Sequence, residues 1–245
     1  ATTPPRDLTW IFYDHEEVEA SANSLTRIAS ERPDLLVGDF AVLMEPTSAK
    51  VEGGCQGTLR FTVTTKGKAA HSARAWMGHN AIHDLAEVLA VLRDHEPEQP
   101  VVDGLRYHEG LNAVAVTGGI AGNVIPDTAT VSVNYRFAPH RSLADAEHYC
   151  RSLLPDHDLT ITVGSAGARP GLDVSAAATF VDAVGGEPSA KFGWTDVARF
   201  SALGVPAVNF GPGDPSKAHA DDEFCPIDEL YTCRDALLRW LDRPA

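Results

Sequence analysis

The sequence predicts an α/β protein in which helices flank a mostly parallel sheet and a ferredoxin-like domain of βαββαβ order is inserted. Three observations predict this class. Continuous apolar runs at 8–13 and 39–44 each end on acidic residues, as buried parallel strands often do. The middle of the chain instead alternates apolar and polar positions around two amphipathic helical segments. The last third returns to the first pattern. The expected domain boundaries are 1–52 and 164–245 for one domain and 53–163 for the inserted one.

The first part of the chain is expected to form a parallel βαβ unit. The run 8–13 predicts a buried strand, residues 21–30 have a helical composition, and 39–44 predicts a second buried strand. The carboxyl ends of parallel strands meet at one edge of a sheet. We therefore expect the acidic residues that follow both runs, Glu16 and Glu45 among them, to lie on one rim.

The inserted part is expected to form a sheet with two helices packed on it. One helix is predicted to begin near Asn80. The other is predicted to begin after Ser142, because Ser142 and Asp145 have the spacing of a capping box. Alternation of apolar and polar residues predicts strands at 57–64, 112–117, 128–137 and 159–163.

The last part of the chain is expected to complete the first domain. It contains a predicted helix at 176–184, a short strand at 205–210 and a turn-rich loop that leads to His219. The final helix is predicted to begin near Pro226, because proline is favoured at the first helical position. Residues of this helix that are expected to be buried are Ile227, Leu230, Tyr231, Leu237, Leu238 and Leu241.

Composition excludes several classes of function. The 245-residue chain has a formal net charge of −14 and scattered Lys and Arg residues, which argues against a basic face for nucleic acid. No apolar run is long enough to span a membrane. The four cysteines have no zinc-finger or disulfide spacing and are typical of free thiols in a reducing compartment. We therefore expect a soluble cytoplasmic protein that binds neither nucleic acid nor membrane.

The chemical prediction depends on the stretch Asp14-His15-Glu16-Glu17. Adjacent ionised carboxylates at the end of a buried strand are costly unless a cation lies nearby, and a metal ion is the usual cation. Glu17, Glu45 and His219 each end or follow a predicted strand, so they are candidate metal ligands. Glu16 is then close to the metal without binding it, as a general base requires. The alternative is a solvated acidic loop with a structural histidine.

Nine short segments resemble the M20 family of metallopeptidases and deacylases, and together they extend over nearly the whole chain. None is specific alone, but all nine in this order are. The segments are 14–17 (DHEE), 43–47 (LMEPT), 67–74 (GKAAHSAR), 78–83 (GHNAIH), 122–127 (GNVIPD), 134–137 (NYRF), 193–196 (GWTD), 211–213 (GPG) and 218–223 (AHADDE). Within the family, the pattern is most similar to actinobacterial desuccinylases.

The resemblance implies a metal-dependent amide hydrolase. Its reaction converts N-succinyl-LL-2,6-diaminopimelate and water to succinate and LL-2,6-diaminopimelate, a step of lysine biosynthesis. It also implies a cytoplasmic homodimer formed through the inserted domain, with two zinc ions per site that cobalt can replace. Zinc-bound hydroxide would attack the succinyl carbonyl. Alternatives are another M20 enzyme for an N-acyl amino acid, such as acetylornithine deacetylase, or a dipeptidase.

The resemblance also assigns roles to residues. Glu16 matches the general base. His71 matches a histidine that one subunit sends into the active site of its partner to polarise the scissile carbonyl. The residues that match metal ligands are Glu17, Glu45 and His219, and those that match substrate-contacting positions are Asn123, Arg136 and Thr195. For Arg136 the strand pattern agrees, because alternation places it on the polar face of its strand. The alternative for Arg136 is a surface salt bridge.

Part of the family pattern is not found in this chain. In the family, the first metal-binding histidine and the aspartate that bridges the two metals lie upstream of the segment that matches 14–17. Without a bridging carboxylate, two cations repel each other with less compensation. We therefore expect the chain as given to bind metal weakly and to have little hydrolase activity. A non-catalytic dimerisation or binding module is a further alternative.

Overall fold

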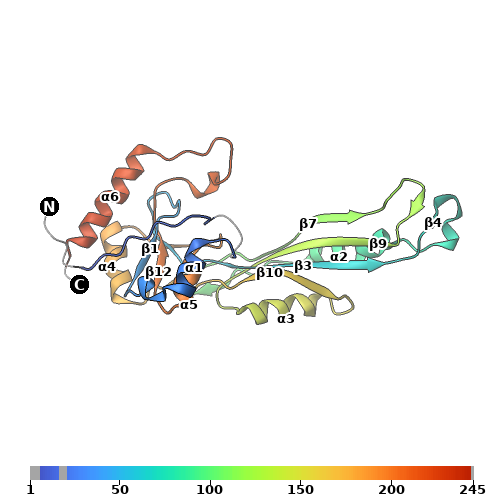
Figure 1. The fold of residues 1–245 in the computed structure, drawn as a ribbon, viewed down its shortest axis with the longest axis horizontal. Coiled ribbons are helices and arrows are strands. Elements are labelled where there is room, and N and C mark those ends of the chain that lie inside the picture. Colours follow the sequence, from blue (N-terminus) through green and yellow to red (C-terminus); the bar gives the residue numbers. More distant parts are fainter. Residues whose placement is uncertain (1–5, 17–20, 244–245) are drawn as a thin grey trace. The chain divides into compact units, whose positions relative to one another are not determined.

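The computed structural model describes residues 6–16 and 21–243, which form two compact units (Figure 1). The first unit contains the chain up to Cys55, the segment Val101–Arg106 and the chain from Ala168 onwards. The second unit contains Gln56–Pro100 and Tyr107–Gly167. The return of Val101–Arg106 to the first unit is not indicated by the sequence pattern.

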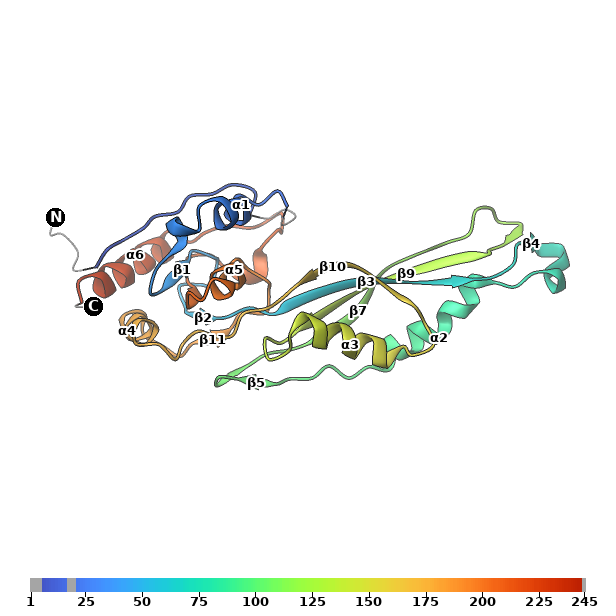
Figure 2. The same cartoon turned by 60° about the horizontal axis from the view of Figure 1, so that its bottom comes forward.

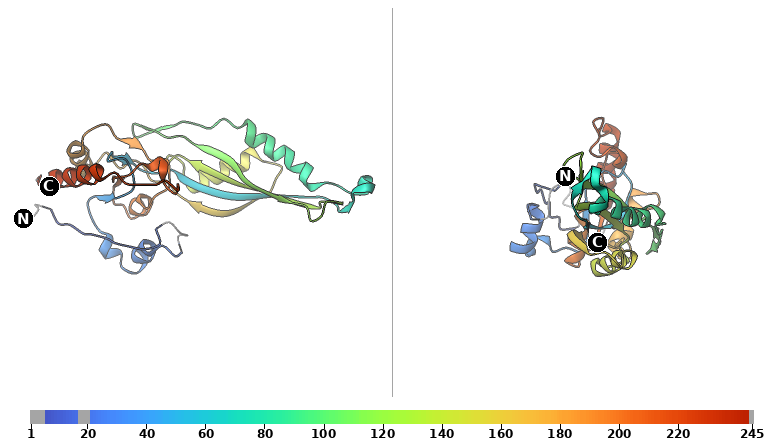
Figure 3. Two further views of the ribbon diagram at one scale, coloured as in Figure 1. Left: turned by 90° about the horizontal axis from the view of Figure 1, so that it is seen from above. Right: turned by 90° about the vertical axis from the view of Figure 1, so that its right-hand side faces the viewer.

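The second unit is built on a four-stranded antiparallel sheet whose strands lie side by side in the order β10-β3-β9-β7 (Figure 3). Two helices, α2 and α3, pack on one face of this sheet (Figure 2). This is the expected βαββαβ order. The elements are β3 (Gly57–Lys66), α2 (Ala81–Asp94), β7 (Gly110–Gly118), β9 (Thr128–Phe137), α3 (Leu143–Leu153) and β10 (Leu159–Ser165).

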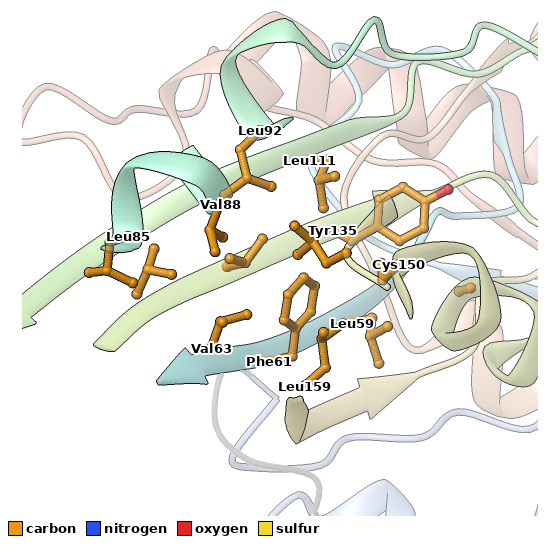
Figure 4. Close-up of a cluster of buried hydrophobic side chains, with 14 of the residues drawn as sticks. Leu59, Phe61, Val63, Leu85, Val88, Leu92, Leu111, Tyr135, Cys150 and Leu159 are labelled. Atoms are coloured by element: carbon orange, nitrogen blue, oxygen red, sulfur yellow. The ribbon is translucent and has the colours of Figure 1, made fainter. Parts of the chain in front are cut away.

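The alternation of apolar and polar residues along β3 and β9 determines which face of the sheet carries the core of the second unit. The two strands pair without a shift from Gly57 opposite Phe137 to Lys66 opposite Thr128. Successive side chains of a strand point to opposite faces. One face of the sheet therefore carries the core that α2 and α3 cover (Figure 4), and burying each large side chain there stabilises the fold by about 1.5–3 kcal/mol. Core residues include Leu59, Phe61, Val63, Leu85, Val88, Leu92, Tyr135 and Cys150.

Both helices of the second unit begin at the residues that the sequence indicates. The side chain of Asn80 accepts a hydrogen bond from the backbone N–H of Ile82, which satisfies one of the free donors at the start of α2. At α3, Ser142 and Asp145 form the reciprocal hydrogen bonds of a capping box. The expected capping box is thus confirmed.

The first unit contains a small mixed sheet in the order β1-β12-β2-β11. The pairs β1/β12 and β2/β11 are parallel, whereas β12/β2 is antiparallel. Helices α4 and α6 contact each other beside this sheet. Its elements are α1 (Ser24–Glu31), β1 (Ala41–Leu43), β2 (Glu52–Gly53), α4 (Ser175–Val184), β11 (Ser189–Ala190), α5 (Val197–Ala202), β12 (Ala207–Asn209) and α6 (Ile227–Leu241).

Short elements complete the fold. Cys55 and Ala168 form an isolated antiparallel bridge in which each backbone N–H donates to the carbonyl of the other residue, at 3.0 Å in both directions. Among the described residues, no helix is both long and apolar enough to cross a membrane. The remaining elements are η1 (Pro33–Leu36), β4 (Ala70–His71), η2 (Ser72–Met77), β5 (Val101–Val102), β6 (Leu105–Arg106), β8 (Val124–Ile125) and η3 (Pro215–Lys217).

The predicted buried strand at 8–13 is wrong. These residues pair with no strand of the described chain, and β1 is an edge strand that pairs only with β12. Ile11 and Tyr13 pack partly against a cluster of buried residues in the first unit, whereas Trp10 is 67% exposed. The segment keeps the period of two of an extended chain. An apolar run is buried on both faces only when neighbouring strands and covering helices are present.

The predicted buried face of the final helix is also partly wrong. Ile227, Leu230, Tyr231 and Leu238 are exposed, and the fully buried residues of α6 are Cys233, Ala236 and Trp240. Helical spacing gives the residues that share a face, but this helix is apolar on more than one face. The face that packs on α4 is the one that carries Trp240, whose ring contacts Phe180 edge to face.

Candidate active site

Glu16 lies at the end of the extended segment, in a turn that is tied to the start of α1. The Asp14 carbonyl accepts a hydrogen bond from the Ser24 N–H at 3.2 Å, and the Ser24 hydroxyl donates to the Asp14 carboxylate. The intervening His15 has a φ of 59°, in the left-handed region that non-glycine residues seldom adopt. The backbone is thus held in a tight turn immediately before Glu16. Glu17, a predicted metal ligand, lies outside the described residues.

Asp196 is the buried centre of the hydrogen bonds around this turn. Its side chain is fully buried and accepts from Asn23 Nδ2 at 3.0 Å. Arg199 forms an ion pair and a hydrogen bond with the same carboxylate. The Asp196 carboxylate also interacts with the Tyr13 hydroxyl. A buried carboxylate needs such partners because desolvation otherwise disfavours its charge.

The carboxylates of the predicted site lie near the Tyr13 hydroxyl. Burial raises the pKa of Tyr13 above its ordinary value, and the negative charge of Asp196 is the next cause. The charges of Glu16 and Glu45 raise this pKa further. Both charges therefore act at the Tyr13 hydroxyl. The expected rim of two strand ends is not formed, because residues 8–13 pair with no strand of the described chain, and the meeting of Glu16 and Glu45 stays a prediction.

The turn that carries Glu45 is packed against the loop that begins at Gly211. A Cβ atom at Gly211 would lie 2.5 Å from the Glu45 carbonyl oxygen, so only glycine allows this approach. The Thr47 hydroxyl forms hydrogen bonds with the Lys50 carbonyl and the Gly211 backbone. Lys191, which is 8% exposed, donates from Nζ to the Pro46 carbonyl at 3.1 Å. These contacts fix the backbone that presents Glu45.

His219 is exposed and lies in a turn with a φ of 65°. Its backbone N–H donates to the Glu223 carboxylate at 3.0 Å, which holds the turn through the main chain. Within residues 6–16 and 21–243, no three His, Cys, Asp or Glu side chains form a group that could hold a metal ion. Glu45 and His219 are thus two candidate donors that do not amount to a metal site in the described part of the chain.

Thr195, a predicted substrate contact, is 3% exposed. Its hydroxyl donates to Asn209 Oδ1 at 2.8 Å, and its carbonyl accepts a weak hydrogen bond from the Cys55 thiol. The Asn209 amide in turn donates to the Gly54 carbonyl at 2.9 Å. Asn209 of β12 therefore links the Thr195 side chain to the chain after β2, and Thr195 directly precedes the buried Asp196.

His71 and Asn123 lie together in the second unit. Strand β4 pairs with β8, which sets His71 opposite Val124. The Ser72 N–H donates to the Asn123 carbonyl at 2.9 Å. The exposed His71 ring accepts a hydrogen bond at Nδ1 from the Ala73 N–H at 3.1 Å, which fixes the ring orientation. If Nδ1 is the acceptor, Nε2 carries the proton and can donate to a carbonyl oxygen.

Arg136 lies on the face of the β10-β3-β9-β7 sheet that α2 and α3 do not cover. It is opposite Thr58 on β3 and Gly110 on β7, and its neighbours Tyr135 and Phe137 point into the core. The predicted polar-face position is therefore observed. Its contacts with substrate stay a prediction.

Sequence reasoning did not assign a role to Tyr13, Asn23 or Asp196. The sequence pattern places Tyr13 in an apolar run, although its hydroxyl is a polar group that needs a partner when buried. Asn23 precedes a helix and accepts from the Leu25 N–H at 2.8 Å, which an N-cap pattern could have indicated. Asp196 ends the 193–196 segment but carries no local signal of its contacts with distant residues.

Comparisons with known proteins agree on one family. The sequence pattern of the peptidase dimerisation domain matches residues 54–162. The chain is 51% identical over 240 residues to a putative succinyl-diaminopimelate desuccinylase DapE of Mycobacterium tuberculosis, covering 97% of this chain and 68% of that protein. It is 45% identical over 247 residues to the succinyl-diaminopimelate desuccinylase of Corynebacterium glutamicum, covering 98% of this chain and 67% of that protein.

A solved structure shares the fold. An M20 family metallo-carboxypeptidase of Sulfolobus solfataricus superposes with a TM-score of 0.68 and 17% identity, over 93% of this chain and 68% of that chain. At this identity the likeness concerns the fold alone. The chain spans about two thirds of the length of each of these three proteins.

Proposed function

Because the chain belongs to the M20 family of metallopeptidases and deacylases, we propose that it acts as a succinyl-diaminopimelate desuccinylase. The reaction hydrolyses N-succinyl-LL-2,6-diaminopimelate to succinate and LL-2,6-diaminopimelate. The observation that carries the proposal is the 51% identity to a putative desuccinylase over 97% of this chain. The same relationship supports a place in lysine biosynthesis and a cytoplasmic location.

Glu16 is the proposed general base. It takes a proton from the attacking water as the new C–O bond forms and passes a proton to the amine as the C–N bond breaks. Hydrogen bonds from Ser24 and Asn23 to the Asp14 and Glu16 carbonyls hold the backbone of its turn. His71 of the partner subunit is proposed to donate to the carbonyl oxygen as negative charge develops there. Asn123, Arg136 and Thr195 are the proposed substrate contacts.

M20 enzymes use a divalent metal ion, and we propose zinc, two ions per site, with cobalt as a possible substitute. The described donors, Glu45 and His219, do not form a metal-binding group by themselves, and the third proposed ligand, Glu17, lies outside the described residues. We therefore assign no step of the reaction to the metal. Dialysis against a chelator followed by zinc addition is the direct test of the metal requirement.

The replacement Glu16→Gln tests the proposed reaction. It keeps the size of the side chain but removes the base, so we expect the rate of succinate release to fall about 10²- to 10⁴-fold. The matched control is Glu87→Gln, an exposed residue of α2, which should leave the rate unchanged. Assays with N-succinyl-LL-2,6-diaminopimelate, N-acetylornithine and dipeptides should show preference for the first. Faster turnover of either competitor would contradict the proposed substrate.

The proposed homodimer forms through the inserted domain. Strand β7 is an edge of its sheet and exposes apolar side chains, Val114 at 61% and Val116 at 52%. Unpaired edges with apolar side chains favour pairing with another chain. We expect Val116→Lys to shift the dimer towards monomer in analytical ultracentrifugation. Thr160→Lys on β10, the opposite edge of the sheet, is the control that should leave the dimer intact.

A further inference from the structure

We infer that Asp196 is a positioning residue that holds the Glu16 turn in place from both sides through Tyr13 and Asn23. The inference rests on the proposed function, because it assigns a purpose to Asp196 in that reaction. Neither Asp196 nor its two partners is among the residues that the family resemblance assigns to catalysis, to metal binding or to substrate contact.

The two partners of Asp196 flank Glu16 along the chain. Tyr13 precedes Glu16 by three residues, and its hydroxyl interacts with the Asp196 carboxylate. Asn23 follows Glu16, and its Nδ2 donates to Asp196 Oδ2 at 3.0 Å and lies 3.4 Å from the Glu16 carbonyl oxygen. The amide of Asn23 thus lies between the buried acid and the backbone of the catalytic residue. One carboxylate restrains both ends of the turn.

The Asn23 side chain is itself fixed by α1. Its Oδ1 accepts from the Leu25 N–H at 2.8 Å and from the Thr26 N–H at 3.3 Å, as an N-cap does. Since Oδ1 is held by the helix, Nδ2 points in one direction, towards Asp196 and Glu16. Asn23 is 1% exposed, so water cannot easily replace these partners.

Asp196 is held on its other side by a cation. Arg199, one turn later on α5, pairs with the carboxylate, and its guanidinium carbon lies over the Trp194 ring, 5.2 Å from the ring centroid. Asp196 occupies the N-cap position of α5 but makes no side-chain capping hydrogen bond there. Its oxygens are directed to Tyr13, Asn23 and Arg199 instead, which is consistent with a role in fixing the neighbouring segment.

The strained backbone at His15 explains why the turn needs this restraint. A φ of 59° is unfavourable for a non-glycine residue, and such a conformation persists only where its surroundings determine it. His15 lies between Tyr13 and Glu16, inside the segment that Asp196 restrains. Releasing the restraint should let His15 leave this conformation and move the Glu16 carboxylate.

Amide hydrogen exchange tests the restraint without relying on enzyme activity. The Ser24 N–H, which donates to the Asp14 carbonyl, and the Leu25 N–H, which donates to Asn23, report on the two sides of the turn. In Asp196→Asn and in the milder Tyr13→Phe, we expect their exchange to become about tenfold faster. The controls are Asp34→Asn and Tyr231→Phe, both exposed residues of the first unit. Unchanged exchange in both test variants would overturn the inference.

Kinetics then distinguish positioning from general stability. Misplacement of a catalytic group by about 1 Å costs on the order of 10²-fold in rate, so Asp196→Asn should lower kcat about 10- to 100-fold and leave KM within about twofold. If Asp196 acts through Tyr13, the double variant that combines Asp196→Asn with Tyr13→Phe should have a kcat only slightly lower than that of Asp196→Asn alone. Faster exchange with unchanged kcat would overturn the positioning role.

The proposed function and the restraint by Asp196 can fail separately, because different measurements test them. A wild-type protein without desuccinylase activity would remove the assigned reaction, whereas the exchange rates of Ser24 and Leu25 would still decide whether Asp196 restrains the turn. If Asp196→Asn does not fold, Tyr13→Phe supplies the same test, because it removes only the hydroxyl that contacts Asp196.

Discussion

Two apolar segments of similar pattern have opposite environments in the two units. In β3 of the second unit, Leu59, Phe61 and Val63 are at most 1% exposed, because β9 and β10 pair on either side and helices cover the face. In the extended segment of the first unit, Trp10 and Phe12 are 67% and 90% exposed. In both segments the exposure of the side chains alternates from one residue to the next. The difference teaches that pairing partners, and not apolar character, decide whether a strand-like segment is buried.

The largest expected effect comes from exchanging one phenylalanine in each segment for alanine. Phe61→Ala should lower the free energy of unfolding by about 3–5 kcal/mol, because it leaves a cavity in a close-packed core. Phe12→Ala should change it by no more than about 0.5 kcal/mol, because that ring is exposed. Chemical denaturation of both variants measures the two changes in the free energy of unfolding. Equal losses would break the comparison by showing that Phe12 is buried in solution.

A smaller effect is expected from the helix caps, which also differ between the units. Ser142→Ala removes the capping box of α3 and should lower the free energy of unfolding by about 1 kcal/mol. Helix α4 of the first unit begins at Val174, whose side chain makes no capping hydrogen bond. Val174→Thr adds an acceptor at nearly the same volume and should raise stability by about 0.5 kcal/mol or less. Thermal unfolding of both variants would sharpen the comparison between the capped helix α3 and the uncapped helix α4. A lower melting temperature for Val174→Thr than for wild type would contradict it.

The smallest expected effect is a pH dependence of the same cap. Hydrogen bonds from Ser142 are the main cause that lowers the pKa of Asp145 below its ordinary value of 3.8. An acid whose pKa is lower in the folded state stabilises the fold above its unfolded pKa, and this contribution is lost as the pH falls through the folded pKa. The difference in melting temperature between wild type and Asp145→Asn should therefore shrink below pH 3.8. A difference that stays constant into stronger acid would show that the charge of Asp145 plays no part.

The sequence predicts the second unit well because its signals are local. Alternation sets the faces of β3 and β9, and Asn80 and Ser142 mark the helix starts through contacts within three residues. In the first unit, the decisive contacts join distant residues. Whether 8–13 becomes a strand depends on a neighbour for β1, and which face of α6 is buried depends on α4. The sequence of a segment does not indicate which distant strand or helix will pack against it.

The same distinction applies to the candidate site. Glu16 and Glu45 are expected to lie together because both follow apolar runs, and that placement stays a prediction, although the charges of both raise the pKa of Tyr13. Asp196 could not be connected to Glu16, because its contacts with Tyr13 and Asn23 span more than half of the chain. The roles of His71, Asn123, Arg136, Thr195 and His219 stay predictions.

The bridge between Cys55 and Ala168 has a consequence for how the chain folds. Bringing together two residues so far apart in sequence costs conformational entropy, which rises with the length of the loop that is closed. In the second unit, Thr58 already pairs with Ser165, so the sheet of that unit holds the two ends of the loop three residues from the bridge. Once the sheet of the inserted unit has formed, most of the entropy cost of closing this loop has been met. The two long stretches of the first unit, which end at Cys55 and begin at Ala168, then meet across a short gap.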